Sequence, residues 1–532
     1  MRKFLPVFLF VAAIASSLPA SAHDDADAAG KLGRISGFAT SCDPAVQAEF
    51  ERAVAMLHSF WYNLAESTFA DVLAKDPACT VTAWGYAAIL MSNPLGGVGA
   101  TAAGAAKAQA AIDNARRNPP RTQRERDYVE ASAAYYEDWA NRPEKARQAA
   151  RAKAFEALAA KYPEDDEAQI FSALYIAGTQ SQADQTYSAY LRAVAILEPQ
   201  FKKYPDHPGV AHYLIHSYDA PPLAAKGLVA ARRYAGIAPD APHALHMPSH
   251  IFTRVGSWEE SIATNARSAT AARAAADWGE AYHASDYAVY AYLQLARDAE
   301  ARRTMDEAFK YSGGDGPALA YPYAAAAMPA RFALERGDWK AAAQLSPNPG
   351  KPPFTQAITY FARALGAARS GDVPAAEKDA QQLAALHRQL ETARNAYWAT
   401  EVEVQQLAVA GWIAHAQGKA EEGAKLMRAA ADLEDRNEKH IVTPGRALPA
   451  RELLGEMLLE QKQPAEALAA FEASQVREPN RFRNYAGSAR AAEMMGDKAK
   501  AREYNARLVE LAKKGDGDRP ELVRARASIA QQ

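Results

Sequence analysis

The chain has 532 residues, with 61 basic and 63 acidic side chains and a formal net charge of −2. A chain of this length exceeds one compact core, so several domains or a repeat array are expected. Because the charges are balanced and no basic block occurs, nucleic acid is excluded as an expected partner.

The N-terminus has the pattern of a cleaved signal peptide. Arg2 and Lys3 precede an apolar run, and Ala20-Ser21-Ala22 matches an A-x-A cleavage site. Cleavage after Ala22 predicts an exported protein, in a bacterial periplasm or secreted. An uncleaved N-terminal anchor is the alternative. No later stretch has 18 uninterrupted apolar residues, so no membrane span is expected after cleavage.

The chain contains two cysteines, Cys42 and Cys79. In an oxidising compartment a lone pair of cysteines usually forms a bridge. A zinc site is less favoured because no CxxC spacing occurs. The sequence therefore predicts a Cys42–Cys79 disulfide.

Helical periodicity dominates the rest of the chain. Ala-rich stretches place apolar residues at i, i+3, i+4 and i+7, and Gly, Asp and Pro interrupt them every 15 to 20 residues. Two distant segments share the pattern A-x3-F-x7-P, as Ala65, Phe69 and Pro77 and again as Ala467, Phe471 and Pro479. Glycine turns recur at 254–261, 335–342 and 494–501. These patterns indicate an all-α array of repeats.

In these motifs the chain resembles the tetratricopeptide repeat (TPR) family, whose units are 34-residue helical hairpins. The stretches HMPSHI (246–251) and PGRALPARELLG (444–455) also resemble a group of exported bacterial TPR proteins. That resemblance implies the fold and export, but no activity. It implies hairpins that stack into a right-handed superhelix with a concave inner wall.

In this repeat pattern Cys42 and Cys79 would lie at the same end of adjacent hairpins, where a bridge would hold the N-terminal unit.

The repeat pattern divides the chain into seven parts. The parts are a signal peptide (1–22), a flexible segment (23–40), N-terminal TPR-like repeats (41–200), His-rich repeats (201–315), irregular repeats (316–430), C-terminal repeats (431–515) and a tail (516–532).

Six of the twelve histidines fall within residues 207–250. His212 and His216 are four residues apart, as are His246 and His250, and 34 residues separate the two pairs. The repeat therefore places both pairs at equivalent sites on neighbouring first helices. In the TPR family these slots line the ligand groove, so the resemblance implies that they face it. The predicted groove residues are His212, His216, His243, His246, His250, His283 and Asp286.

The same spacing is typical of metal ligation. First helices of neighbouring units pack about 8–10 Å apart, so two histidines on each could converge on one ion. The predicted ligands are His212, His216, His246 and His250, with His243 and Asp219 as additional ones. Neutral imidazole suits divalent zinc, copper, nickel or iron.

Two other interpretations remain open for the histidines: a structural polar network between units, and contact with an acidic peptide or small molecule. Pro248 is expected to start or kink its helix, which would redirect His250. No nucleophile elbow, P-loop, HExxH or Rossmann motif occurs, so whether the protein is an enzyme stays open. The sequence favours an exported scaffold that binds a protein segment or small ligand in its groove. The alternative is a metal-binding protein or metal-dependent enzyme.

Overall fold

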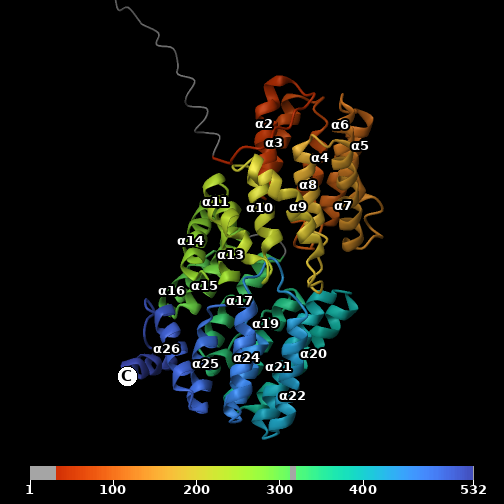
Figure 1. Cartoon of the computed structure of the whole chain (residues 1–532). Coiled ribbons are helices and arrows are strands. Elements are labelled where there is room, and N and C mark those ends of the chain that lie inside the picture. Colours follow the sequence, from red (N-terminus) through yellow and green to blue (C-terminus); the bar gives the residue numbers. More distant parts are fainter. Residues whose placement is uncertain (1–30, 312–318, 531–532) are drawn as a thin grey trace, which may run out of the picture.

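The computed structural model describes residues 31–311 and 319–530, and every regular element in these ranges is a helix (Figure 1). The expected signal peptide lies outside the described residues. Successive helices pack against one another along the chain, and most first helices of the hairpins also contact the next first helix. The protein is therefore an α-solenoid of TPR-like hairpins.

The first helices of the hairpins form one row and the second helices form the other. The first row comprises α2 (Gln47–His58), α4 (Thr82–Leu90), α6 (Gln123–Tyr136), α8 (Asp166–Ala177), α10 (Pro208–Tyr218), α12 (Pro242–His246) with α13 (Pro248–Val255), α15 (Trp278–Gln294), α17 (Ala320–Glu335), α19 (Pro353–Arg369), α21 (Ala396–Ala416), α23 (Ala450–Glu460) and α25 (Phe482–Met495). The second row comprises α3 (Tyr62–Lys75), α5 (Ala102–Arg117), α7 (Glu144–Lys161), α9 (Ser188–Lys203), α11 (Leu228–Ile237), α14 (Trp258–Ala274), α16 (Asp298–Ala308), α18 (Trp339–Ala343), α20 (Val373–Thr392), α22 (Ala420–Asp435), α24 (Pro464–Arg477) and α26 (Lys498–Leu511). The helix α27 (Pro520–Ala530) follows, and two short 3-10 helices are η1 (Pro44–Val46) and η2 (Ala224–Gly227).

The repeated aromatic of the second helix packs as the motif predicts. Phe69 of α3 is fully buried, and a Cβ atom on Gly85 of α4 would lie 2.5 Å from its ring. Phe471 of α24 meets Gly455 of α23 in the same way, at 2.7 Å. The glycine is needed because the aromatic ring lies where its Cβ atom would be. The same contact between a phenylalanine and a glycine therefore packs the helices near both ends of the chain.

Two features depart from a regular array. Pro248 begins a new helix, so that one first helix is divided into α12 and α13. Farther along, α18 has only five residues, whereas α20 and α21 have 20 and 21. Hairpin length therefore varies most in the part of the chain where the repeat pattern is weakest.

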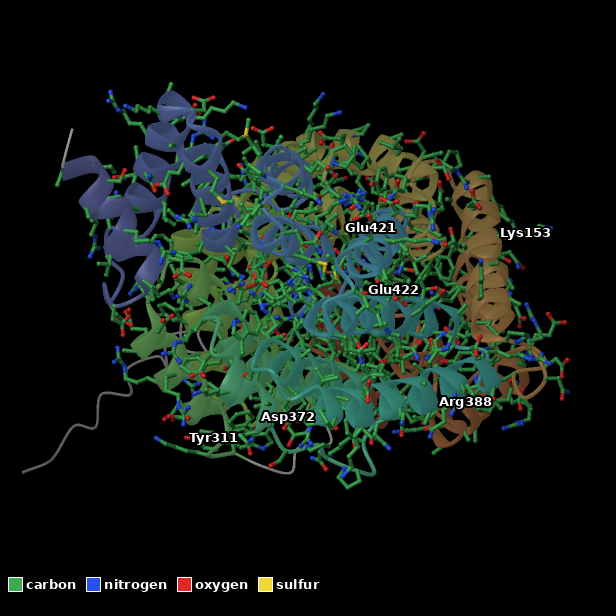
Figure 2. The ribbon with its side chains drawn as sticks, turned by 90° about the horizontal axis from the view of Figure 1, so that it is seen from below. Lys153, Tyr311, Asp372, Arg388, Glu421 and Glu422 are labelled. Atoms are coloured by element: carbon green, nitrogen blue, oxygen red, sulfur yellow. A yellow bond between two sulfur atoms is a disulfide. The ribbon has the colours of Figure 1, made fainter. Side chains whose placement is uncertain are left out.

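The array folds back on itself. The helix α2 contacts α10, and α15 contacts α25. Between α22 and α23, residues 436–449 extend to α10 and α13, where Lys439 lies 3.1 Å from Asp219. Charged side chains such as Lys153, Arg388 and Glu421 are exposed on the outside (Figure 2). The row of first helices is thus covered where α2 and residues 436–449 lie over it.

The stretch 31–40 is packed rather than flexible, which corrects the expectation for this part of residues 23–40. Phe38 is fully buried and stacks on Trp84. The hydroxyl group of Ser36 donates a hydrogen bond of 2.7 Å to Glu167. The segment therefore adds to the core of the N-terminal hairpins.

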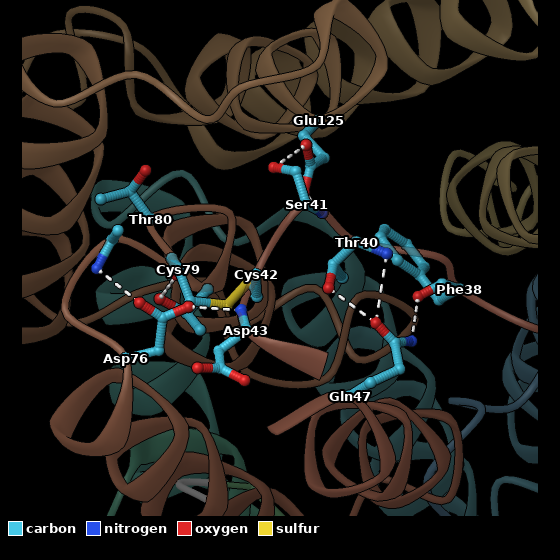
Figure 3. The surroundings of a disulfide bond; sticks show 12 residues. Phe38, Thr40, Ser41, Cys42, Asp43, Gln47, Asp76, Cys79, Thr80 and Glu125 are labelled. Carbon is cyan, nitrogen blue, oxygen red and sulfur yellow. Dashed lines mark hydrogen bonds between the residues drawn. A yellow bond between two sulfur atoms is a disulfide. The ribbon is translucent and has the colours of Figure 1, made fainter. Parts of the chain in front are cut away.

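The structure pairs Cys42 with Cys79, with their Cα atoms 4.8 Å apart (Figure 3). The backbone N–H of Asp43 donates to the Asp76 carboxylate at 2.7 Å, which joins the same two chain segments beside the bridge. The predicted disulfide is confirmed, and it links the segment before α2 to the segment before α4.

Among the described helices, none combines the length and the apolar character that crossing a membrane requires.

Replacing both cysteines by serine should lower the free energy of unfolding by about 4 kcal/mol, because the bridge closes a loop of 37 residues in the unfolded chain. Urea denaturation of the oxidised protein and of the double variant measures the difference. Wild-type protein under reducing conditions is the control and should match the variant. Equal stability of all three samples would contradict a structural role for the bridge.

Candidate metal centre

Three adjacent first helices carry the histidine cluster (Figure 1). His212 and His216 belong to α10, His243 and His246 to α12, His250 to α13 and His283 to α15. Their rings form one continuous group, with centroid distances of 5.1 Å for His212–His243, 5.3 Å for His216–His250 and 5.8 Å for His243–His246.

The cluster lies inside the protein. His243 is half-buried, and the other predicted groove residues are buried, with exposed fractions of 0% for His212, 2% for His216, 0% for His246, 1% for His250, 6% for His283 and 1% for Asp286. The expectation that these residues line an open groove is therefore wrong. The helices face the inner wall, but α2 and residues 436–449 cover that wall.

The histidines form two sets of three rather than the predicted single set of four. His212, His216 and His243 make the first set, and one ring nitrogen from each lies within 4.8 Å of the others. His246, His250 and His283 make the second set under the same limit. His243 thus belongs to the first set as a full member. The third member of the second set is His283, and neither α10 histidine belongs to it.

In the first set, His212 and His243 are each hydrogen bonded through Nδ1, and the other ring nitrogens are not. Nδ1 of His212 donates to the backbone carbonyl of His58 at 2.7 Å, and Nδ1 of His243 lies 3.0 Å from the Glu280 carboxylate. Nε2 of His212, Nε2 of His243 and both ring nitrogens of His216 are buried without a hydrogen-bond partner. The first set therefore presents free imidazole nitrogens to one another.

In the second set, Nδ1 of His246 lies 2.7 Å from Oδ1 of Asn265, and Nδ1 of His250 lies 2.9 Å from the Asp219 carboxylate. The two Nε2 atoms face each other at 3.0 Å. The ring of His283 is 4.2 Å from that of His246, measured between centroids.

Aromatic rings enclose both sets. Phe60, from the turn between α2 and α3, lies 4.4 Å from the ring of His212 and stacks on His243 at 5.5 Å. Tyr287 of α15 contacts His246 and His250 at 4.7 and 5.1 Å. These rings separate the imidazoles from solvent.

Burial keeps the histidines neutral. Desolvation, followed by neighbouring histidines, lowers the pKa of His212, His216 and His246 well below the ordinary value. Desolvation also lowers the pKa of His283 to about 3. Neutral imidazole is the form that binds metal ions, so the cluster is ready to ligate at neutral pH.

Asp219 orients His250 and is itself held by two cations. Its carboxylate accepts a hydrogen bond of 2.7 Å from Arg254 and one of 3.1 Å from Lys439. Burial alone would raise the pKa of Asp219, but Lys439 and Arg254 outweigh it and hold the carboxyl ionised. Desolvation in turn lowers the pKa of Lys439 to about 8. Asp219 is thus a partner of the second set and not a ligand of the first.

Asp286 does not join the histidines. It forms a buried ion pair with Arg331 of α17, and burial raises its pKa to about 6. Its carboxylate therefore links α15 to α17, and its predicted place among the groove residues is not supported.

A third buried group, which the sequence did not single out, consists of His58, Glu167 and His207. The ring of His58 bonds to Tyr213 and to Glu167, both at 2.8 Å. His207 bonds to Glu167 at 3.0 Å and accepts from the backbone of Val210. All four ring nitrogens have partners, so this group is a satisfied structural network.

Sequence reasoning missed Glu280, Asn265, Phe60 and His58, which surround the centre. Glu280 carries a weak signal, because it precedes His283 by one helical turn. The other three had none. Asn265 belongs to no motif, and His58 and Phe60 lie about 150 residues before His212, which both contact.

Comparisons with known proteins show similarity to solved structures alone. The chain matches no protein-family model and no curated protein. Among solved structures it is similar to the APC/C hetero-tetramer Cut9–Hcn1, with 11% identity, a TM-score of 0.29 and coverage of 92% of this chain and 95% of that one. It is also similar to the human IFIT1 dimer with PPP-AAAA, with 13% identity, a TM-score of 0.37 and coverage of 77% and 87%. TM-scores this low carry no information about a shared site.

The metal-free protein should lose stability as the pH falls from 6.5 to 5.5. The folded-state pKa of His212, His216 and His283 lies below the unfolded value of about 6.5, so the unfolded chain takes up protons first. Their contribution is complete above pH 6.5 and declines by about 1.4 kcal/mol per pH unit for each histidine. Urea denaturation with a chelator present measures it.

The variant His283→Leu is the control for this effect. The variant lacks one titrating group, so unfolding takes up one proton fewer. Its stability should therefore decline less steeply over the same pH range, by about 1.4 kcal/mol per pH unit. An equally steep decline in the variant, or no decline in the wild type, would contradict the assignment of neutral buried histidines.

Proposed function

We propose that this protein is an exported helical-repeat protein that holds a transition-metal ion on His212, His216 and His243. The role combines the scaffold, which the helix packing defines, with a centre that the three histidines build. Metal binding replaces peptide binding in a groove as the favoured function, because the imidazoles are buried.

One observation carries the proposal: the inward nitrogens of the first set have no partner. A buried polar group without a hydrogen bond costs about 1–3 kcal/mol, and native proteins rarely leave several together. The unpaired atoms are Nε2 of His212, Nε2 of His243 and both ring nitrogens of His216. A metal ion bound among them would satisfy three imidazoles at once, at bond lengths of about 2.0–2.1 Å.

The outward hydrogen bonds support the same interpretation. A ligating histidine typically donates its other N–H group to a carboxylate or a backbone carbonyl, which fixes the tautomer and the ring orientation. Glu280 does this for His243, and the carbonyl of His58 does it for His212. Both histidines are therefore oriented by their Nδ1 hydrogen bonds, which leaves Nε2 available to an ion.

The donor set indicates the class of metal. Three neutral imidazoles suit zinc, copper, nickel or iron rather than calcium or magnesium, which prefer oxygen ligands. Three protein ligands also leave a coordination position for water or a small ligand, as in catalytic zinc sites. Such a centre has the arrangement of a reactive metal site more than that of a closed structural one.

The proposed location is the periplasm or the cell exterior. The signal-peptide pattern of residues 1–22 supports export, and the Cys42–Cys79 pair suits an oxidising compartment. A protein or peptide partner remains part of the proposal for the solenoid surface, but it would contact exposed side chains and not the buried histidines.

Protein purified without added chelator should contain zinc, copper, nickel or iron, and His243→Ala should lose the ion from the first set. His243 is chosen because it is half-buried, so its replacement should leave the fold intact. The matched control is His387→Ala, on the distant helix α20, which should retain the full metal content. Elemental analysis with a melting curve checks both; no metal in the wild type, before and after loading, refutes the proposal.

Glu280→Gln should weaken metal binding at the first set by about 10–100-fold, because the amide is a poorer acceptor for Nδ1–H of His243. Competition with a chromophoric chelator measures the dissociation constant. Glu391→Gln, beside His387 on α20, serves as the control. Unchanged affinity in Glu280→Gln would show that His243 does not bind the ion.

A further inference from the structure

The second set of histidines has a geometry that hydrogen bonding alone does not satisfy. Building on the proposed function, we infer that His246, His250 and His283 hold a second transition-metal ion, and that the two ions form one dinuclear centre. Three features point to this centre: the tautomers of His246 and His250, the place of His283 and the contacts between the two sets.

The tautomer of His246 is fixed by Asn265. The amide nitrogen of Asn265 donates to the backbone carbonyl of Ser261 at 2.7 Å, which orients the side-chain amide. Its oxygen therefore points at Nδ1 of His246, 2.7 Å away, and must accept a proton from it. Neutral His246 consequently carries its proton on Nδ1 and a lone pair on Nε2.

The tautomer of His250 is fixed by Asp219. An ionised carboxylate only accepts hydrogen bonds, so Nδ1 of His250, 2.9 Å from it, is the donor. Nε2 of His250 then also carries a lone pair. The two Nε2 atoms are 3.0 Å apart, so two acceptors face each other in a buried site. The facing lone pairs repel each other, and a positively charged species between them would turn that repulsion into two bonds.

A metal ion meets the requirement better than a proton. Two nitrogens bound to one ion at about 2.0–2.1 Å lie about 2.9–3.4 Å apart for right-angle to tetrahedral geometry, which includes the observed separation. A proton would join His246 and His250 alone. An ion would also engage His283, because one nitrogen from each ring lies within 4.8 Å of the others.

The two sets are in direct contact. His243 and His246 are one turn apart on α12, with ring centroids 5.8 Å apart, and His216 meets His250 at 5.3 Å. These distances between the sets fall within the range found inside the second set, from 4.2 Å for His246–His283 to 6.2 Å for His250–His283. Paired metal ions in enzymes are about 3.5–4 Å apart and share a ligand. The ring contacts between the sets would bring two ions into one cluster of this kind.

The geometry also indicates what the two ions would share. The described carboxylates near the sets, Glu280 and Asp219, bond to Nδ1 atoms on the outside, so neither occupies the space between the sets. The rings are buried and enclosed by Phe60 and Tyr287. A ligand shared by the two ions would therefore have to be small, such as hydroxide. The hydroxyl group of Tyr287, 3.4 Å from Nε2 of His250, lies at the second set as a donor to it.

Copper(II) titration with electron paramagnetic resonance tests the inference. The wild type should bind two ions, and its resonance intensity should fall well below the total copper because coupled spins cancel. His283→Ala should bind one ion with full intensity, and His243→Ala should do the same through the other set. Two ions with full intensity, or one ion only, would overturn the dinuclear centre while leaving the proposed function intact; no bound copper at all would refute both.

A second variant tests the tautomer argument and keeps the fold as a separate readout. In Asn265→Leu the acceptor at Nδ1 is gone, so His246 can carry its proton on Nε2 and donate it to His250. We expect the second ion to bind about 10–100-fold more weakly and the first ion to bind unchanged. Equal affinity for the second ion, in a variant with a normal melting curve, would overturn the assignment of the facing lone pairs.

Discussion

The centre of this protein depends on ring nitrogens that are buried without a hydrogen-bond partner. Four such atoms occur in His212, His216 and His243. In His246 and His250 the two Nε2 atoms instead face each other at 3.0 Å. Each unpaired buried polar atom costs about 1–3 kcal/mol. Apolar side chains of the same size would avoid this cost and would pack equally well between helices. The buried imidazoles therefore support the proposal that a ligand completes their bonds, since a metal ion can bond several at once.

Four of the six rings are held on their outward side, each by a different part of the chain. The carbonyl of His58 comes from the end of α2, Asn265 from α14, Glu280 from α15 and Asp219 from the end of α10. Lys439, from the segment 436–449, neutralises Asp219 in turn. Asn265, Glu280 and Asp219 belong to the cluster's own hairpins, whereas His58 and Lys439 are distant in sequence. The contacts of His58 with His212 and of Lys439 with Asp219 therefore exist only once the array has folded back. Binding of an ion would consequently stabilise contacts between hairpins far apart in sequence.

The sequence was sufficient for the fold and for part of the centre. A 34-residue stride places His216 beside His250, since equivalent residues of stacked hairpins lie side by side. It could not divide the histidines into two sets, because Pro248 starts a new helix and shifts the register, so that His212 meets His243 instead. Nor could it predict burial. The covering segments lie 154 residues before His212, at His58, and 220 residues after Asp219, at Lys439, and no local pattern encodes contacts over such separations.

Phe60 shows how a repeat protein closes its inner wall. The residue lies in the turn between the two helices of its hairpin with a φ of 53°, a conformation that costs a non-glycine residue about 1–3 kcal/mol. The same turn position holds Gly256, Ala296 and Lys462 in other hairpins, with φ of 70°, 52° and 60°. The backbone shape is thus a property of the array, and a small or polar residue satisfies it. At this one turn the chain places a phenyl ring, which covers His212 and His243. In an open solenoid water would hydrogen-bond to those imidazoles. The phenyl ring excludes water from them, which suits the proposed metal ion.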